Sequence, residues 1–261
     1  MSDSLPNPTS AAAGRDATAT LSPLRRRLQW PLLALAVIGL AYAAFVISAK
    51  VSTPRNLQVS AAGAGFQARM QQPARQAFDL KGLTIPANRV LSGGPPKDGI
   101  PALTRPQFVP AKEAMFMEEA DRVIGVTVAG EAKAFPLKIL DYHEAVNDEV
   151  GGVPLAVTYC PLCDSSAVYD RRQGEQQVEF GISGLLNHSK VLLFDRGDPG
   201  QESLWSQMMS AAVSGPEVDR RLTKLPLEYT TWSDWLARHP GTEVLSQETG
   251  HNRRYDRTVY R

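Results

Sequence analysis

The chain has 261 residues, of which 28 are Lys or Arg and 27 are Asp or Glu, so its formal net charge is +1. Charge of both signs is spread along the chain. This excludes the basic surface that nucleic-acid-binding proteins need, and no nucleic-acid partner is expected. Only two residues are cysteine, which excludes a disulfide-rich framework of the kind that holds small secreted domains together.

The N-terminal region predicts a membrane anchor. Residues 1–27 are rich in small and polar residues and end in three arginines, which predicts a disordered cytoplasmic tail. Residues 28–50 contain the uncharged run Trp30–Ala49, long enough for about 30 Å of helix and so for one bilayer crossing. We therefore expect a single-pass protein of the cell inner membrane whose C-terminal domain is periplasmic or extracytoplasmic. A cleaved signal peptide is the alternative, since Ala41-Tyr42-Ala43 is typical of a cleavage site.

The exported part divides into a linker and a domain. Residues 51–79 show no clear period and predict a stalk. Residues 80–261 are numerous enough for one domain with its own core. Their patterns predict short strands joined by turns. The expected strands are two halves of a hairpin at 123–128 and 131–137, a central strand at 153–159, a second hairpin formed by 167–171 and 177–182, and a strand at 190–195.

Helices are expected to be few. One short helix is predicted over 138–147. A clearer one runs from Thr231 to His239, because Thr231 can cap it, Asp234 follows three residues later, and Pro240-Gly241 ends it. Strands without regular intervening helices predict an α+β, β-rich domain with few short helices, preceded by one transmembrane helix.

Several stretches together resemble a known family, the bacterial and archaeal domain of unknown function 3179. They are 142–148, 157–163, 180–186, 202–207, 230–232, 239–240 and 244–245. The string Tyr159-Cys160-Pro161-Leu162-Cys163 is the most specific of them. The resemblance covers about residues 80–261 and implies the extent of the domain rather than an activity. The chain differs from the family pattern at Asp164, where a small residue is usual, and in an elaboration at 197–200.

The two cysteines are the strongest functional signal, because Cys160 and Cys163 are only two residues apart and lie between two predicted strands. This spacing is typical of zinc or copper ligands, of a thiol–disulfide redox pair, and of a small structural disulfide. In such a turn Asp164 can occupy the left-handed conformation. The chain has no second Cys pair, so a zinc or copper ion would need His or carboxylate ligands as well.

Four further residues are candidates for this site. His143 is the best additional ligand or acid–base partner, and Glu144, Asp195 and His188 are weaker candidates. The sequence therefore favours a metal-binding or metal-handling domain of the cell envelope, with zinc or copper as the expected cofactor. A thiol–disulfide oxidoreductase is the first alternative. A non-catalytic interaction domain with a structural disulfide is the second. The protein or small-molecule partner is not identified by the sequence.

Overall fold

The computed structural model describes residues 78–260. The predicted tail at 1–27, the predicted membrane helix at 28–50 and all but the last two residues of the predicted linker lie outside the described residues. Between residues 78 and 260, no helix is long and apolar enough to cross a membrane. This part of the chain is a β-rich domain with two short α-helices.

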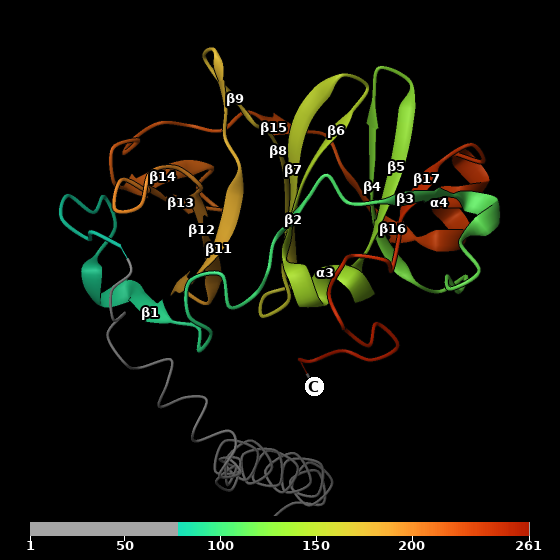
Figure 1. Cartoon of the computed structure of the whole chain (residues 1–261), viewed down its shortest axis with the longest axis horizontal. Helices are drawn as coiled ribbons and strands as arrows, with labels where there is room; N and C mark the ends of the chain where they lie inside the picture. Colours follow the sequence, from blue (N-terminus) through green and yellow to red (C-terminus); the bar gives the residue numbers. More distant parts are fainter. Residues whose placement is uncertain (1–77, 261) are drawn as a thin grey trace, which may run out of the picture. The chain divides into compact units, whose positions relative to one another are not determined.

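Three five-stranded sheets stand side by side (Figure 1). Sheet I has the order β1-β11-β12-β13-β14, with bounds Val90–Ser92, Phe180–Asn187, Lys190–Asp195, Leu204–Ser206 and Ala211–Ser214. Sheet II has the order β15-β8-β7-β6-β2, with bounds Lys224–Leu225, Ser165–Asp170, Val153–Cys160, Ala145–Val150 and Leu103–Thr104. Sheet III has the order β16-β4-β5-β17-β3, with bounds Glu228–Thr231, Arg122–Val128, Glu131–Pro136, Glu243–Leu245 and Phe108–Pro110.

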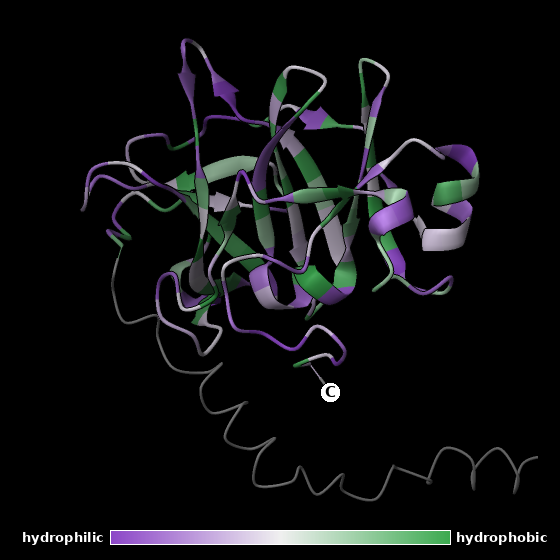
Figure 2. Cartoon of the chain, turned by 45° about the vertical axis from the view of Figure 1, so that its right-hand side comes forward, coloured by the Kyte–Doolittle hydropathy of each residue, from purple (hydrophilic) through white to green (hydrophobic). Residues whose placement is uncertain are grey.

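Sheet II is the middle layer, because its two faces contribute to two different cores. Val146, Val157 and Val168 pack against Ile124 and Phe135 of sheet III. The alternate residues of the same strands face sheet I, where they pack against Phe180, Ile182, Val191, Leu193 and Trp205 of that sheet. These alternate residues are Ala145, Ala156, Cys160, Ala167 and Tyr169. Apolar strand segments accordingly fill the interior, while turns and the C-terminal segment are hydrophilic (Figure 2). Strands apolar on both faces are typical of a central sheet.

Two helices and two 3-10 turns complete the domain. α3 (Leu137–His143) leads from β5 into β6, and α4 (Trp232–Arg238) packs Trp235 on the outer face of sheet III. The 3-10 turns are Ala87–Arg89 and Ala111–Glu113. Thr231 caps α4 as expected, since its side chain accepts a hydrogen bond from the Asp234 N–H group.

Two expectations about secondary structure are wrong in detail. The predicted helix at 138–147 ends at His143, because Glu144 adopts a left-handed conformation (φ 56°) and the chain continues as strand β6. The predicted second hairpin exists only as the short pair β9 (Arg172–Gln173) and β10 (Gln176–Gln177). The longer strands on either side, β8 and β11, belong to sheets II and I and do not pair with each other. The predicted hairpin of β4 and β5 and the predicted strand β7 are confirmed.

Candidate functional site

The two cysteines lie on one tight turn at the end of sheet II. Cys160 is the last residue of β7, and Cys163 precedes β8. The N–H group of Cys163 donates to the Cys160 carbonyl over 3.3 Å, which makes the segment a β-turn with Cα atoms less than about 7 Å apart. That separation is compatible with a disulfide. Both thiols are free in the structure.

The two sulfurs differ in environment. The Cys160 side chain is 1% exposed and lies in the core between sheets I and II, with Sγ 3.7 Å from the Ser189 carbonyl oxygen. Cys163 is half-buried at the edge of the same core. Burial, and then the hydrogen bond with Cys163, raise the pKa of the Cys160 thiol to about 12. Cys160 is therefore a protected thiol and Cys163 the accessible one.

A hydrogen-bond chain leads away from Cys163. Its Sγ lies 3.0 Å from the Ser165 hydroxyl, and Ser165 donates to Oε1 of Gln207 over 2.9 Å. Gln207 is fixed in turn by its Nε2, which donates to the Thr158 hydroxyl over 3.1 Å. A serine hydroxyl has one hydrogen, so Ser165 can reorient that hydrogen from Gln207 to a Cys163 thiolate.

Asp164 holds the turn against sheet III. It has φ 50°, which confirms the predicted left-handed conformation. Its carboxylate accepts hydrogen bonds from the Tyr229 hydroxyl, from the Arg122 guanidinium at 2.7 Å and from the Tyr159 hydroxyl at 3.0 Å. The Tyr229 bond, followed by those from Arg122 and Tyr159, outweighs partial burial and lowers the pKa of Asp164. The residue that departs from the family pattern thus fixes the position of the turn.

His143, the best additional candidate, is fully buried with both ring nitrogens in use. Nδ1 lies 2.8 Å from the Pro101 carbonyl oxygen, and Nε2 lies 2.7 Å from the Tyr255 hydroxyl. Burial lowers the pKa of His143 to about 4, so the ring is neutral. No group of three His, Cys, Asp or Glu side chains within residues 78–260 is arranged to hold a metal ion. The predicted zinc or copper centre stays a prediction.

Glu144 lies beside the cysteine turn. Its carbonyl oxygen accepts a 2.8 Å hydrogen bond from the Tyr159 N–H group. The pairing of β6 with β7 begins at the next residue, with Ala145 opposite Thr158. Its carboxyl is 5% exposed and accepts a 2.6 Å hydrogen bond from the Tyr260 hydroxyl. Burial raises the pKa of Glu144 to about 7.

The other two candidates lie in different places. His188 is exposed in the turn between β11 and β12, where His188 and Ser189 both have positive φ. This turn contacts the site through the Ser189 carbonyl, not through the imidazole. Asp195 lies at the opposite end of β12, and its carboxylate accepts hydrogen bonds from the Ser203 N–H group and from Nε1 of Trp205. The structure thus gives Asp195 a role in joining β12 to β13.

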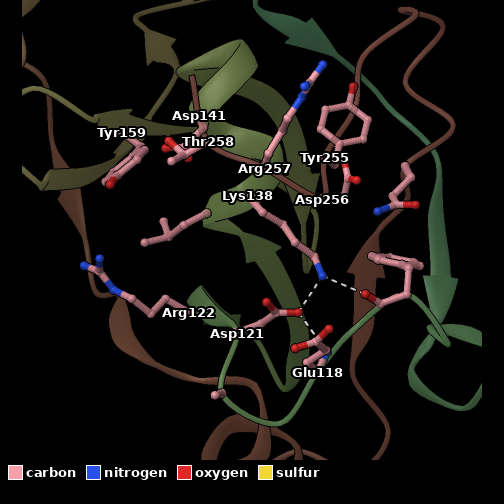
Figure 3. A pocket seen from close by; sticks show the side chains of 14 residues that line it. Glu118, Asp121, Arg122, Lys138, Asp141, Tyr159, Tyr255, Asp256, Arg257 and Thr258 are labelled. Atoms are coloured by element: carbon pink, nitrogen blue, oxygen red, sulfur yellow. Dashed lines mark hydrogen bonds and ion pairs between the residues drawn. The ribbon is translucent and has the colours of Figure 1, made fainter. Parts of the chain in front are cut away.

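A cavity of about 600 Å³ opens beside the site and has Asp141 and Tyr159 in its wall (Figure 3). Lys138 is neutralised there by Asp121. Asp141 makes no such ion pair within the described part of the chain, and burial raises its pKa. The C-terminal residues Arg257 and Thr258 form another part of the wall.

Sequence reasoning missed Tyr260, Ser165 and Gln207. Tyr260 lies in a polar C-terminal segment, and nothing in the sequence around it indicates a contact with Glu144. Gln207 belongs to one of the stretches that carry the family resemblance, and this was the only available indication of a role.

Residues 97–261 match the family model described as Protein of unknown function (DUF3179). The match covers more than half of the chain and confirms the resemblance found in the sequence. No curated protein and no solved structure matches the chain.

Proposed function

The chain belongs to the DUF3179 family, and we propose that its domain is a thiol–disulfide oxidoreductase in which Cys163 attacks and Cys160 resolves. One observation carries the proposal: two free thiols share one tight turn, and one is half-exposed while the other is buried. Exchange through a mixed disulfide needs one thiol that a partner can reach and a second that is close but protected.

Cys163 has the surroundings of an attacking thiol. It is accessible, and the Ser165 hydroxyl is in place to donate to its thiolate. The thiolate is the nucleophile in disulfide exchange, so a donor beside the sulfur favours reaction. Its attack on a disulfide of a protein or small-molecule partner forms the Cys163–partner bond and releases the partner's other sulfur as a thiolate.

Cys160 has the surroundings of a resolving thiol. It is too buried to meet a partner directly, but it lies within one turn of Cys163. Its attack on Cys163 Sγ forms the Cys160–Cys163 disulfide and releases the second partner sulfur. The domain loses two electrons and the partner disulfide gains them. The proposed location is the outer face of the inner membrane, with the helix predicted at 28–50 as the anchor. Thiol–disulfide couples are active in this oxidising environment.

A second candidate function is the capture of a soft metal ion, favoured by the position of two free thiols on one tight turn. Two thiolates suit Cu(I). Zinc needs at least three protein ligands, and His143 would have to release Pro101 or Tyr255 to become one. Copper is therefore the better match to this turn.

A redox titration of the full-length protein in detergent tests the proposal. We expect a reversible Cys160–Cys163 disulfide with a midpoint between about −300 and −120 mV, the range of exchange catalysts. A midpoint below about −300 mV would indicate a structural disulfide and would favour the alternative of a non-catalytic interaction domain. The variants Cys160→Ser and Cys163→Ser are matched controls, because each leaves a single thiol in the chain. One tightly bound equivalent of copper, lost in both variants, would favour the second candidate.

A further inference from the structure

The Gln207 side chain has an orientation that its neighbours fix. It is 1% exposed, and its Nε2 atom lies 3.3 Å from the Ser165 carbonyl oxygen and 3.1 Å from the Thr158 hydroxyl. A carbonyl oxygen can only accept a hydrogen bond, so the atom that faces it is the amide nitrogen. The Thr158 hydroxyl donates its own hydrogen to the Ala167 carbonyl over 2.9 Å, and so it accepts from the same nitrogen.

This orientation determines the direction of the hydrogen bond between Gln207 and Ser165. Oε1 of Gln207 lies 2.9 Å from the Ser165 hydroxyl, and an amide oxygen cannot donate. Ser165 therefore gives its single hydrogen to Gln207. In the 3.0 Å contact between Ser165 Oγ and Cys163 Sγ, the thiol must then be the donor. The Cys160 carbonyl oxygen lies farther from this sulfur, at 3.9 Å.

The bonds consequently run in one direction, from the Cys163 S–H group through Ser165 to Gln207. A Cys163 thiolate in this arrangement would face a lone pair of Ser165 instead of a hydrogen, which disfavours the charged form. Ser165 can donate to the thiolate only by turning its hydrogen away from Gln207. The buried Oε1 atom would then lose its hydrogen bond, and leaving a buried acceptor unpaired costs free energy.

We propose that Gln207 restrains the attacking thiol by holding the Ser165 hydrogen away from the Cys163 sulfur, so that Cys163 becomes reactive when Ser165 turns. The inference rests on the proposed function, because it concerns Cys163 as the attacking group. On activation the Cys163 proton passes to the solvent, since this side chain is only half-buried. The hydrogen bond from Ser165 to Gln207 breaks, and one from Ser165 to the Cys163 sulfur forms. Gln207 is a positioning residue, because it acts on the thiol through Ser165.

Alkylation of Cys163 by iodoacetamide tests the inference in the full-length protein carrying Cys160→Ser. The change Gln207→Met removes Oε1 at nearly constant side-chain length and frees the Ser165 hydrogen for the thiolate. Alkylation at neutral pH should become about tenfold faster, because the thiolate no longer forms at the expense of a buried acceptor. The midpoint of the pH profile of alkylation should move to lower pH. Gln177→Met is the matched control at an exposed glutamine of β10, and it should leave both quantities unchanged.

The Ser165→Ala background separates a positioning role from a structural one. Without the Ser165 hydroxyl, Gln207 has no hydrogen to hold, so Gln207→Met should change neither the rate nor the pH profile in this background. An equal acceleration in both backgrounds would indicate a disturbed turn and would overturn the inference. An unchanged or slower rate in Gln207→Met alone would overturn it as well.

If Gln207→Met does not fold, NMR of the glutamine-labelled Cys160→Ser protein decides. One glutamine side-chain amide signal should shift over the pH range in which alkylation accelerates, because its oxygen loses the bond from Ser165. The shift should be absent in Ser165→Ala, and a glutamine spectrum without any such shift would overturn the inference. The redox titration keeps the two proposals apart. A midpoint in the range of exchange catalysts leaves the proposed function intact when the Gln207 predictions fail, whereas a midpoint below that range removes the function itself.

Discussion

The Arg122 guanidinium of β4 lies 2.7 Å from the Asp164 carboxylate in the cysteine turn. This contact joins sheet III to the end of sheet II, and the Tyr159 and Tyr229 hydroxyls reinforce it. The turn that carries both thiols is therefore held from outside its own hairpin, and its shape depends on a residue that is not a cysteine.

Asp164 should matter mainly for its backbone conformation. At φ 50°, Asp164→Ala is expected to be about 1–2 kcal/mol less stable than Asp164→Gly, since only glycine adopts this conformation without strain. The lost ion pair is half-exposed and should contribute less than about 1 kcal/mol in either variant. Urea denaturation of both variants measures the difference. Equal stabilities would contradict a strained turn.

Local sequence patterns predicted the elements whose signals are local. Thr231 is a cap residue next to the helix it caps, and β7 is apolar enough to be a central strand. The end of α3 could not be predicted in this way. The residues after Glu144 are as compatible with a helix as with a strand, and pairing of β6 with β7 decides between them.

The candidate site was predictable only at its centre. Cys160 and Cys163 are close in sequence, so their spacing reveals them. Tyr260 and Glu144 are 116 positions apart, and no periodicity connects such a pair. His143 was expected beside the thiols for its chemistry, but Pro101 and Tyr255 engage both of its nitrogens. A buried histidine with two partners and a ligand histidine look alike in sequence.

His143 should make the domain more stable as pH rises. Its pKa is lowered from 6.5 to about 4 by burial, so between these values the unfolded chain binds a proton that the folded chain does not. Stability is then lost as pH falls through this window, by about 3 kcal/mol in total. His143→Gln should lose this dependence in urea denaturation at a series of pH values. His188→Gln, at an exposed histidine, should keep it, and a similar slope in both would contradict the assignment.

Glu144 should have the opposite effect on stability. Burial raises its pKa from 4.5 to about 7, so the folded chain binds the extra proton and stability falls as pH rises through this window. Between about pH 4.5 and 6.5, the contributions of His143 and Glu144 to the pH dependence of stability oppose each other. Glu144→Gln should therefore become more stable with rising pH, and His143→Gln less stable. Parallel slopes in the two variants would show that these groups do not control the pH dependence.

Ser165 should control the reactivity of Cys163 without controlling the fold. Ser165→Ala removes the hydroxyl 3.0 Å from Cys163 Sγ, and hydrogen bonds to charged groups contribute about 1.5–3 kcal/mol. Since the thiolate is the reacting form, alkylation of Cys163 by iodoacetamide at neutral pH should slow about tenfold. The same measurement in the Cys160→Ser background assigns the effect to Cys163 alone. Ser166→Ala is the matched control, because the Ser166 hydroxyl makes no hydrogen bond within the described residues. An equal slowing in both serine variants would indicate a disturbed turn rather than a lost donor.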